Sequence, residues 1–200
     1  MPILEIKNLP AEYETLWSLC APLLQKGRLD DEGHAKETTE FVLNYKGDLK
    51  FDPEVIIPVA MMHDIGHSAI LPEHFKYVTG GQKIANGKLA HMLAGAKIAN
   101  DLLQDINYNP DKIKEIVDII SIHDWDQLDV PNAAAIYDTD NKKLFHDIDV
   151  LDRFNQARLE KYKISYQKED LQKLIKQQLD VFFYPEFKKI AEERFKDLKI

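Results

Sequence analysis

The chain has 200 residues and a mass of 23.1 kDa, which is the size of one ordinary domain and too small for two. Its 44% hydrophobic and 30% charged residues are typical of a globular protein and argue against intrinsic disorder. The 34 acidic and 26 basic side chains give a net charge of −8, and the basic residues form no stripe. Because affinity for duplex nucleic acid comes largely from neutralised phosphates, we expect no duplex partner.

Nothing in the sequence predicts a membrane partner or an oxidising compartment. The longest apolar run, Val55–Met62, is far shorter than the ~18–20 residues of a membrane span, and it contains Pro58. Glu5 interrupts the apolar residues near the N-terminus, so no secretory signal is recognisable. The single cysteine, Cys20, excludes an internal disulfide, and its apolar helical context places it in the core. We therefore expect a cytoplasmic protein.

Apolar residues recur at helical spacing over most of the chain. Asp52 and Asn109 each precede a proline, which predicts a capped start for two of the helices. The helix after Asp52 is apolar on nearly every face, so we expect it to be central, kinked or restarted at Pro58 and ended by Gly66. The other expected helices cover residues 11–25, 31–45, 89–105, 111–123, 142–162 and 169–198, the last broken near Tyr184-Pro185.

Two segments between these helices lack regular periodicity. Residues 72–88 are expected to form a long loop, and residues 125–141 either a lid over a substrate site or a plain connection. No alternating run predicts a strand, so the sequence predicts an all-α fold in one domain over residues 1–200. Residues 165–200 are expected to pack on that domain or to form one face of a homodimer.

A histidine and an aspartate stand together at the end of the most apolar helix. They are His63 and Asp64, between Met62 and Ile65. A buried carboxylate in such surroundings needs a partner, because leaving it unpaired costs several kcal/mol. A metal cation satisfies both side chains, and nitrogen and oxygen ligands suit iron, manganese, zinc, nickel or cobalt.

Other helices bring a histidine or an aspartate to an apolar end in the same way. These residues are His34, His91, His123 and Asp149. Each alone is typical of a satisfied core or surface residue, but jointly they predict a metal site between the central helices. His74 and His146 have no comparable context, and we expect them at the surface.

This set resembles the H…HD…D signature of the HD-domain superfamily, the metal-dependent phosphohydrolases. His34, then His63-Asp64 within His-Asp-Ile-Gly, then Asp149 within Asp-x-Asp-x-Leu-Asp follow the order of that signature. The resemblance spans about residues 30–155 and implies an HD-like helical bundle. It implies that these four residues are the ligands of one metal.

The resemblance also implies a second metal. In the two-metal branch of the superfamily, two further histidines lie between the HD pair and the final aspartate, and His91 and His123 occupy that interval. They would hold the second ion, with Asp64 as a bridge; alternatively one metal is bound and the two histidines line the site. Two divalent ions are expected, iron or manganese above all, with zinc, nickel, cobalt or magnesium as alternatives.

Three residues are the candidates for catalysis under this resemblance. Asp64 would bridge or orient the reacting groups, and Asp124, next to His123, would assist the leaving group. His67 lies four residues after His63 but beyond a glycine, so it would either donate a proton to the substrate or have a structural role.

The candidates for phosphate binding are cationic. Arg153 lies four residues after Asp149 on the same helix face, so it would either meet a phosphate or pair with that aspartate. Lys83 and Lys88 lie in the expected loop, so they would either reach a phosphate from there or belong to a solvated loop.

The function that follows from the resemblance is hydrolysis of a phosphate ester by a metal-activated water, with a small phosphorylated molecule as substrate. Nucleotides are the commonest substrates among similar proteins, but no motif in this sequence indicates recognition of a nucleobase. One alternative is a mixed-valent di-iron oxygenase similar to inositol oxygenase, since that group shares the same ligand set. The other is a non-catalytic regulatory domain, against which the complete ligand set argues.

Overall fold

The computed structural model describes residues 2–71, 73, 80–128, 132–163 and 168–200. Within these residues the chain forms helices and connections and no strand, which confirms the expected all-α class. It divides into two compact units, Met1–Lys142 and Lys143–Ile200, and each is described by itself. The single domain expected over the whole chain, with residues 165–200 packed on it, stays a prediction.

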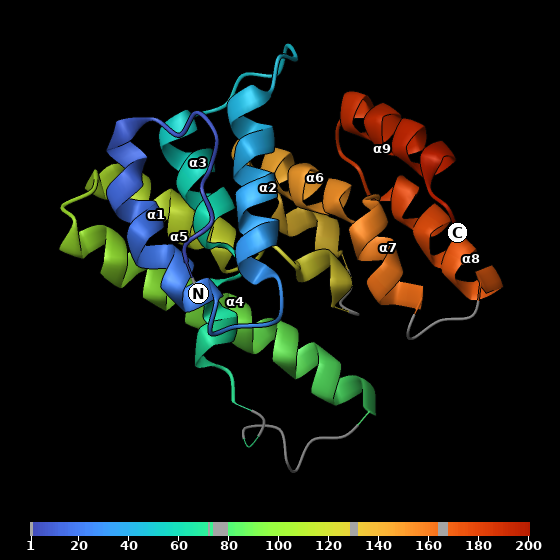
Figure 1. Ribbon diagram of the computed structural model, residues 1–200, viewed down its shortest axis with the longest axis horizontal. Helices are drawn as coiled ribbons and strands as arrows, with labels where there is room; N and C mark the ends of the chain where they lie inside the picture. Colours follow the sequence, from blue (N-terminus) through green and yellow to red (C-terminus); the bar gives the residue numbers. More distant parts are fainter. Residues whose placement is uncertain (1, 72, 74–79, 129–131, 164–167) are drawn as a thin grey trace. The chain divides into compact units, whose positions relative to one another are not determined.

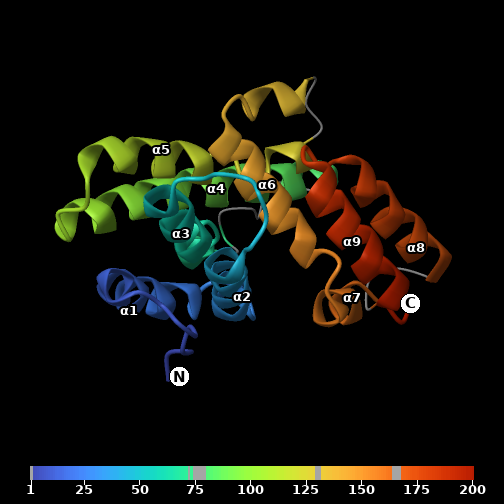
Figure 2. The same cartoon turned by 90° about the horizontal axis from the view of Figure 1, so that it is seen from above.

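The first unit is built around a central buried helix. Its helices are α1 (Ala11–Leu24), α2 (Asp31–Asn44), α3 (Pro53–Met62), α4 (Gly80–Asp105) and α5 (Pro110–Ile120), with the short 3₁₀ helices η1 (Ile65–Ala69), η3 (Trp125–Gln127) and η4 (Ala133–Ile136). Helix α3 packs against α1, α2 and α5, and α4 packs along both η1 and α5 (Figure 1). Seen from above, α1 and α2 lie on one side of α3, and α4 and α5 lie on the other (Figure 2).

Helix α3 begins where the sequence predicts. The side chain of Asp52 accepts a hydrogen bond from the backbone N–H of Glu54 at 3.0 Å, and Pro53 is the first helical residue. Every residue of Val55–Met62 is buried, because the helix is apolar on all faces. The helix runs through Pro58 without restarting.

Helix α4 begins earlier than the sequence indicates. Gly80 is its first residue, so the part of the expected 72–88 loop from residue 80 onward is helical, while residues 72 and 74–79 lie outside the described residues. The segment after Gly81 contains glutamine, lysine, isoleucine and alanine, whose helix propensities offset those of the glycines. Helix α5 has the expected start, since the Asn109 side chain accepts from the N–H of Asp111 at 3.1 Å.

The second unit contains the C-terminal helices. Helix α6 (Asp140–Asp152) leads into it, and α7 (Gln156–Lys163), α8 (Lys168–Gln177), η5 (Gln178–Asp180) and α9 (Pro185–Asp197) follow. The helix expected over 142–162 is therefore two helices, α6 and α7, separated by a turn at 153–155. The break expected near Tyr184-Pro185 is confirmed, because Pro185 is the first residue of α9.

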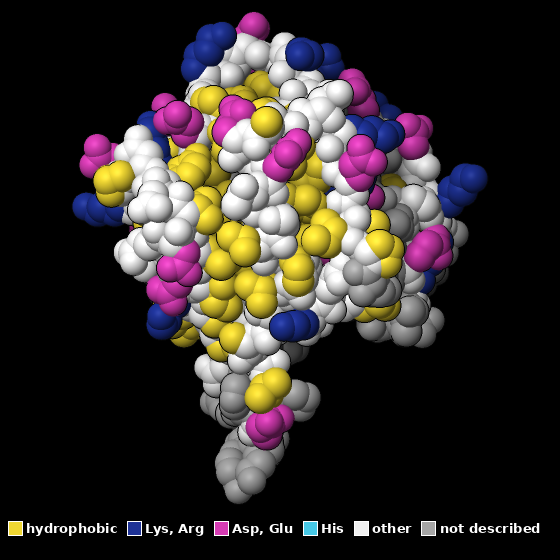
Figure 3. All heavy atoms as spheres, turned by 60° about the vertical axis from the view of Figure 1, so that its left-hand side comes forward, with side chains coloured by type: hydrophobic (Ala, Val, Ile, Leu, Met, Phe, Trp, Pro, Cys, Tyr) yellow, Lys and Arg dark blue, Asp and Glu magenta, His cyan; other side chains and the backbone are white. Residues whose placement is uncertain are grey.

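The core and the surface have the features that the composition predicts: a buried cysteine, a mixed surface and no membrane-spanning helix among the described residues. Cys20 is completely buried, as expected. On the face in Figure 3, apolar side chains gather in the middle and Lys and Arg lie singly among acidic residues. In the described part of the chain, no helix is both long and apolar enough to cross a membrane.

Candidate metal centre

The His63-Asp64 pair lies in a tight turn between α3 and η1. Helix α3 ends at Met62, four residues before the predicted end at Gly66. Asp64 leaves the helical conformation with φ −93° and ψ 1°, and its carbonyl accepts from the N–H of His67 at 3.1 Å to start η1. His63 is 0% exposed and Asp64 4% exposed. The turn therefore holds both side chains inside the unit.

Gly66 has a packing role that the sequence did not reveal. A Cβ built on it would lie 1.9 Å from the carbonyl oxygen of His91 and 2.5 Å from the backbone nitrogen of Gly95. Only glycine fits so close an approach of η1 to α4. Gly95 faces the same contact, since a Cβ there would lie 3.3 Å from the backbone nitrogen of Gly66. The two glycines thus bring His91 next to the His63-Asp64 turn.

Three other histidines reach this turn from three elements. His34 projects from α2 and His91 from α4, and both are buried. Helix α5 ends at Ile120, so His123 lies in the turn that follows it and not, as predicted, in the helix itself. It is 2% exposed.

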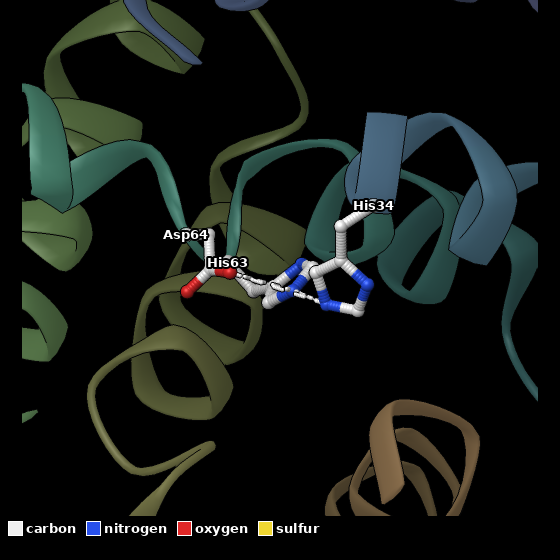
Figure 4. A group of neighbouring side chains, drawn as sticks. All are labelled: His34, His63 and Asp64. Atoms are coloured by element: carbon white, nitrogen blue, oxygen red, sulfur yellow. Dashed lines mark hydrogen bonds and ion pairs between the residues drawn. The ribbon is translucent and has the colours of Figure 1, made fainter. Parts of the chain in front are cut away.

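The two oxygens of the Asp64 carboxylate face different histidines. Oδ2 lies 3.9 Å from His34 Nε2 and 3.7 Å from His63 Nε2 (Figure 4). Oδ1 lies 3.6 Å from Nε2 of both His91 and His123. A carboxylate that divides its oxygens between two pairs of imidazoles has the arrangement of a bridge between two cations.

The histidine rings also pair with each other through Nε2. The Nε2 atoms of His34 and His63 are 2.9 Å apart, and those of His91 and His123 are 3.1 Å apart. The Nδ1 atoms of three of these rings lie near backbone carbonyls, at 3.1 Å for His63, 3.3 Å for His91 and 2.8 Å for His123. A carbonyl only accepts, so the hydrogen-bond network assigns the ring proton to Nδ1 in each of the three.

This tautomer leaves a lone pair on each of those Nε2 atoms. In the His91–His123 pair two lone pairs then face each other at hydrogen-bond distance, which is repulsive without a cation to receive both. Metal-ligating histidines commonly donate their other ring N–H to a carbonyl in this way. The residues therefore fit a metal. Three groups of described residues bring ligand atoms within 4.8 Å of one another: His34, His63 and Asp64; Asp64, His67 and His91; and His91, His123 and Asp124.

The pKa shifts keep the ligands in the forms that bind metal. Burial lowers the pKa of His91 to about 3, and the nearby His123 adds to the effect, so the ring is neutral near pH 7. Burial alone raises the pKa of the Asp64 carboxyl, but the guanidinium of Arg28 opposes it, and the pKa lies well below its usual range. Asp64 is therefore ionised.

Arg28 is the part of this site that the sequence analysis missed. One of its guanidinium nitrogens donates to Asp64 Oδ2 at 2.7 Å, and Nε donates to Asp31 Oδ1 at 3.0 Å. The other oxygen of Asp31 accepts from the backbone N–H of Arg28 at 2.6 Å, so the arginine is fixed at two points. The Arg28-x-x-Asp31 spacing at the start of the helix of His34 was the signal available in the sequence.

Asp124 lies at the His91 side of the site with a lysine beside it. Its Oδ2 is 3.7 Å from His91 Nε2 and 3.5 Å from Lys88 Nζ, and its Oδ1 accepts from the Gln127 side chain. The ammonium group of Lys88 also donates to Gln127. The side chain of Lys83, the other predicted lysine, lies outside the described residues.

His67 lies beside Asp64 on η1. Its ring stacks on that of His91, with centroids 4.1 Å apart and planes 12° apart. Its Nε2 is buried without a hydrogen-bond partner and lies 3.5 Å from Asp64 Oδ1. The structure thus brings His67 to the site, with Nε2 toward the Asp64 carboxylate.

Tyr137, a residue that the sequence analysis did not single out, anchors the His123 turn. Its buried hydroxyl lies 3.1 Å from the carbonyl oxygen of Ile122 and 3.2 Å from that of His123, and it accepts from the N–H of Asp126 at 3.2 Å. Part of the segment expected as a lid or a connection therefore supports the ligand turn. Residues 129–131 lie outside the described residues.

The remaining predicted residues belong to the second unit. Asp149, on α6, is 8% exposed, and its role as a ligand stays a prediction. Arg153 donates to the side chain of Gln178, and its role toward a phosphate also stays a prediction.

One expectation about the other histidines was wrong. His146 is 2% exposed, not at the surface, because its Nδ1 finds a partner in Asp147 Oδ1 at 3.0 Å. The same carboxylate accepts from the backbone N–H groups of Phe183 and Tyr184 at 3.0 and 2.7 Å. A buried imidazole is tolerated here because its neighbouring carboxylate is fully hydrogen-bonded. His74 lies outside the described residues.

Comparison with known proteins agrees with this site. The family model described as HD domain matches residues 32–155, more than half of the chain, and the match includes every predicted metal ligand. No curated protein and no solved structure matches the chain.

Proposed function

Because this chain belongs to the HD-domain family, we propose that it is a metal-dependent phosphohydrolase that cleaves the phosphate ester of a small molecule. The observation that carries the proposal is the position of Asp64, whose two oxygens face different pairs of histidines at 3.6–3.9 Å. In this proposal His34, His63 and Asp64 would hold one divalent ion, with Asp149 as a further ligand. Asp64, His91 and His123 would hold the second.

The chemistry of bound divalent ions suits this reaction. Such ions lower the pKa of a water molecule toward neutrality and neutralise phosphoryl oxygens, so no nucleophilic side chain is needed. Iron or manganese would suit these nitrogen and oxygen ligands, and zinc, nickel, cobalt or magnesium are alternatives.

The cationic side chains at the site would bind the phosphoryl group. Arg28 contacts Asp64 from one side, and Lys88 lies 3.5 Å from Asp124 on the other. An acidic protein with a net charge of −8 would otherwise repel a phosphate ester. Two fixed local cations offset that repulsion at the site itself.

Two groups are the candidates for moving a proton to the leaving oxygen. His67 offers Nε2, a buried atom without a hydrogen-bond partner. Asp124 has Oδ1 held by Gln127, which leaves its Oδ2 toward Lys88 and His91. Replacing each in turn distinguishes them: the true donor is the one whose loss slows esters with poor leaving groups far more than esters with good ones.

The test is phosphate release from a panel of phosphate monoesters by the full chain, purified without a polyhistidine tag. Asp64→Asn should lower the rate by at least about 100-fold. The matched control Asp101→Asn, at an exposed carboxylate of α4, should leave it unchanged. Oxygen consumption without phosphate release would contradict the proposal and favour the oxygenase alternative. Activity that survives Asp64→Asn would contradict it as well.

A further inference from the structure

The first unit has a cavity of about 510 Å³ whose lining includes Arg28, the residue that contacts Asp64 of the candidate metal centre. It lies where the N-terminal segment, the end of α1 and the start of α2 meet. Its lining includes Gln25, Gly27, Arg28, Leu29, Asp30 and Glu32. A volume in the range of small-molecule sites and a mixed apolar and polar wall are typical of a ligand pocket.

Arg28 connects this cavity with the metal centre. The residue forms part of the cavity wall, and its guanidinium donates to Asp64 Oδ2 at 2.7 Å. The adjoining wall residue, Gly27, also lies against the centre, since a Cβ built on it would be 3.1 Å from the Cβ of His67. A ligand held by Arg28 therefore has Asp64 on one side and the cavity on the other.

The remaining cavity wall consists of apolar residues, glycines, two acidic residues and the neutral amide of Gln25. Arg28 is the one cationic residue among those that line it, whereas Asp30 and Glu32 are carboxylates. Leu29 is 91% exposed at this wall, so a bound apolar group would cover leucine surface that otherwise faces water. The wall thus favours a group that is apolar and neutral or cationic, and it disfavours a second anionic group.

We propose that this cavity takes the organic group of a phosphate monoester whose phosphoryl group is held by Arg28 next to Asp64. The inference rests on the proposed hydrolase function and gives its substrate class: monoesters of neutral or cationic organic groups, not diphosphates, triphosphates or esters that carry a carboxylate.

The test measures binding, not turnover. Benzylphosphonate and methylphosphonate each carry a phosphonate group, which resembles the phosphoryl group of an ester but has a carbon–phosphorus bond that is not hydrolysed. The two compounds differ only in the organic group. Isothermal titration calorimetry of the full, manganese-loaded chain without oxygen should show benzylphosphonate binding at least about tenfold more tightly. Equal affinity for the two would overturn the inference.

Leu29→Asp tests whether the organic group lies in this cavity. The side chain is 91% exposed, so the change removes no packing. The substitution should lower the affinity for benzylphosphonate by about tenfold and change the affinity for methylphosphonate by less than about twofold. The matched control Leu19→Asp, at another exposed leucine outside the cavity, should change neither. Unchanged benzylphosphonate affinity in Leu29→Asp would place the organic group elsewhere.

Asp30→Asn tests the acidic wall. The wild-type chain should bind para-carboxybenzylphosphonate several-fold more weakly than benzylphosphonate, and the substitution should narrow that difference. Asp30 has φ 79°, a conformation that asparagine also tolerates, so the backbone is kept. Arg28→Met should weaken all three phosphonates together. If Asp30→Asn leaves the difference in affinity between the two benzylphosphonates unchanged, the inference about the acidic wall is refuted. If Arg28→Met leaves the three affinities unchanged, the inference that Arg28 holds the phosphoryl group is refuted.

The binding and activity experiments separate the two proposals. Selective benzylphosphonate binding that depends on Leu29, without release of phosphate from any ester, would support the cavity as a ligand site and refute the proposed hydrolase function. Ester hydrolysis without any preference for the organic group would support the hydrolase function and refute the cavity as the site of that group.

Discussion

A single methyl group on Gly66 should disrupt both the packing and the metal centre. Glycine at this position lets η1 approach α4 so closely that an added Cβ would lie 1.9 Å from the carbonyl oxygen of His91. The obstructing atom belongs to the backbone of a long helix, so it has no rotamer to change. Relief requires η1 and α4 to separate, and this moves His91 away from Asp64.

The cost of Gly66→Ala can be worked from that distance. An ordinary contact begins at 3.4 Å, so the backbone must open by about 1.5 Å, the difference from 1.9 Å. Overpacking a core typically costs 1–3 kcal/mol, and a backbone obstruction belongs at the upper end, about 3 kcal/mol. For a chain of this length each kcal/mol lowers Tm by a few degrees, so a fall of about 6–12 °C is expected.

The measurement combines thermal unfolding, followed by circular dichroism, with metal content. Gly95→Ala is the matched control on the other side of the same contact. A Cβ there meets neighbours at 3.3–3.4 Å, and the better helix propensity of alanine offsets the small strain, so its stability should stay within about 1 kcal/mol of the wild type. Gly66→Ala with unchanged Tm and metal content would refute the reasoning.

Three further predictions concern other parts of the chain. Tyr137→Phe removes the hydroxyl at the His123 turn, so it should lower the metal affinity by about 10–100-fold. The helix content measured by circular dichroism should stay unchanged. An unchanged metal affinity would show that the turn keeps its conformation without this hydroxyl. Asp147→Ala leaves a buried imidazole and two backbone N–H groups without their carboxylate, and should lower the free energy of unfolding by about 3 kcal/mol or more in urea titrations; a loss below about 1 kcal/mol would contradict this. Burial raises the pKa of the Cys20 thiol, so the native chain should resist a thiol reagent at pH 8, where the unfolded chain reacts at once; fast reaction of the native chain would place the thiol outside the core.

Local sequence signals predicted the helices well where they act on a few neighbouring residues. Asp52 and Asn109 cap α3 and α5 through their own side chains, and each is followed by proline as the first helical residue. The break before α9 follows in the same way from Pro185. Such signals depend on short-range hydrogen bonds and on the fixed φ of proline, so they can be recognised without tertiary structure.

Features that depend on contacts between distant segments could not be predicted. The role of Gly66 depends on α4, which lies 14 or more residues further along the chain. Helix α3 ends at Met62, in the turn that precedes this contact. Arg28 was missed because its partner Asp64 is 36 residues away. The burial of His146 depends on Asp147, which in turn is held by backbone N–H groups of another segment.

The histidines of the site were predicted for a different reason. His34, His63, His91 and His123 occur with Asp64 in an order that resembles a known family, and the chemistry of nitrogen and oxygen ligands explains why they should meet. The sequence did not reveal that the carboxylate of Asp64 divides its oxygens between two pairs of rings. That arrangement is a property of the fold.

The central claim, a two-metal centre bridged by Asp64, is tested most directly by metal content. Inductively coupled plasma mass spectrometry on protein purified without oxygen and without a polyhistidine tag should find about two transition-metal ions per chain, as one ion for each pair of histidines requires. His91→Ala should reduce the content to about one ion and Asp64→Asn should abolish binding of both. A wild-type chain that holds no metal, or one ion that persists in Asp64→Asn, would contradict the account.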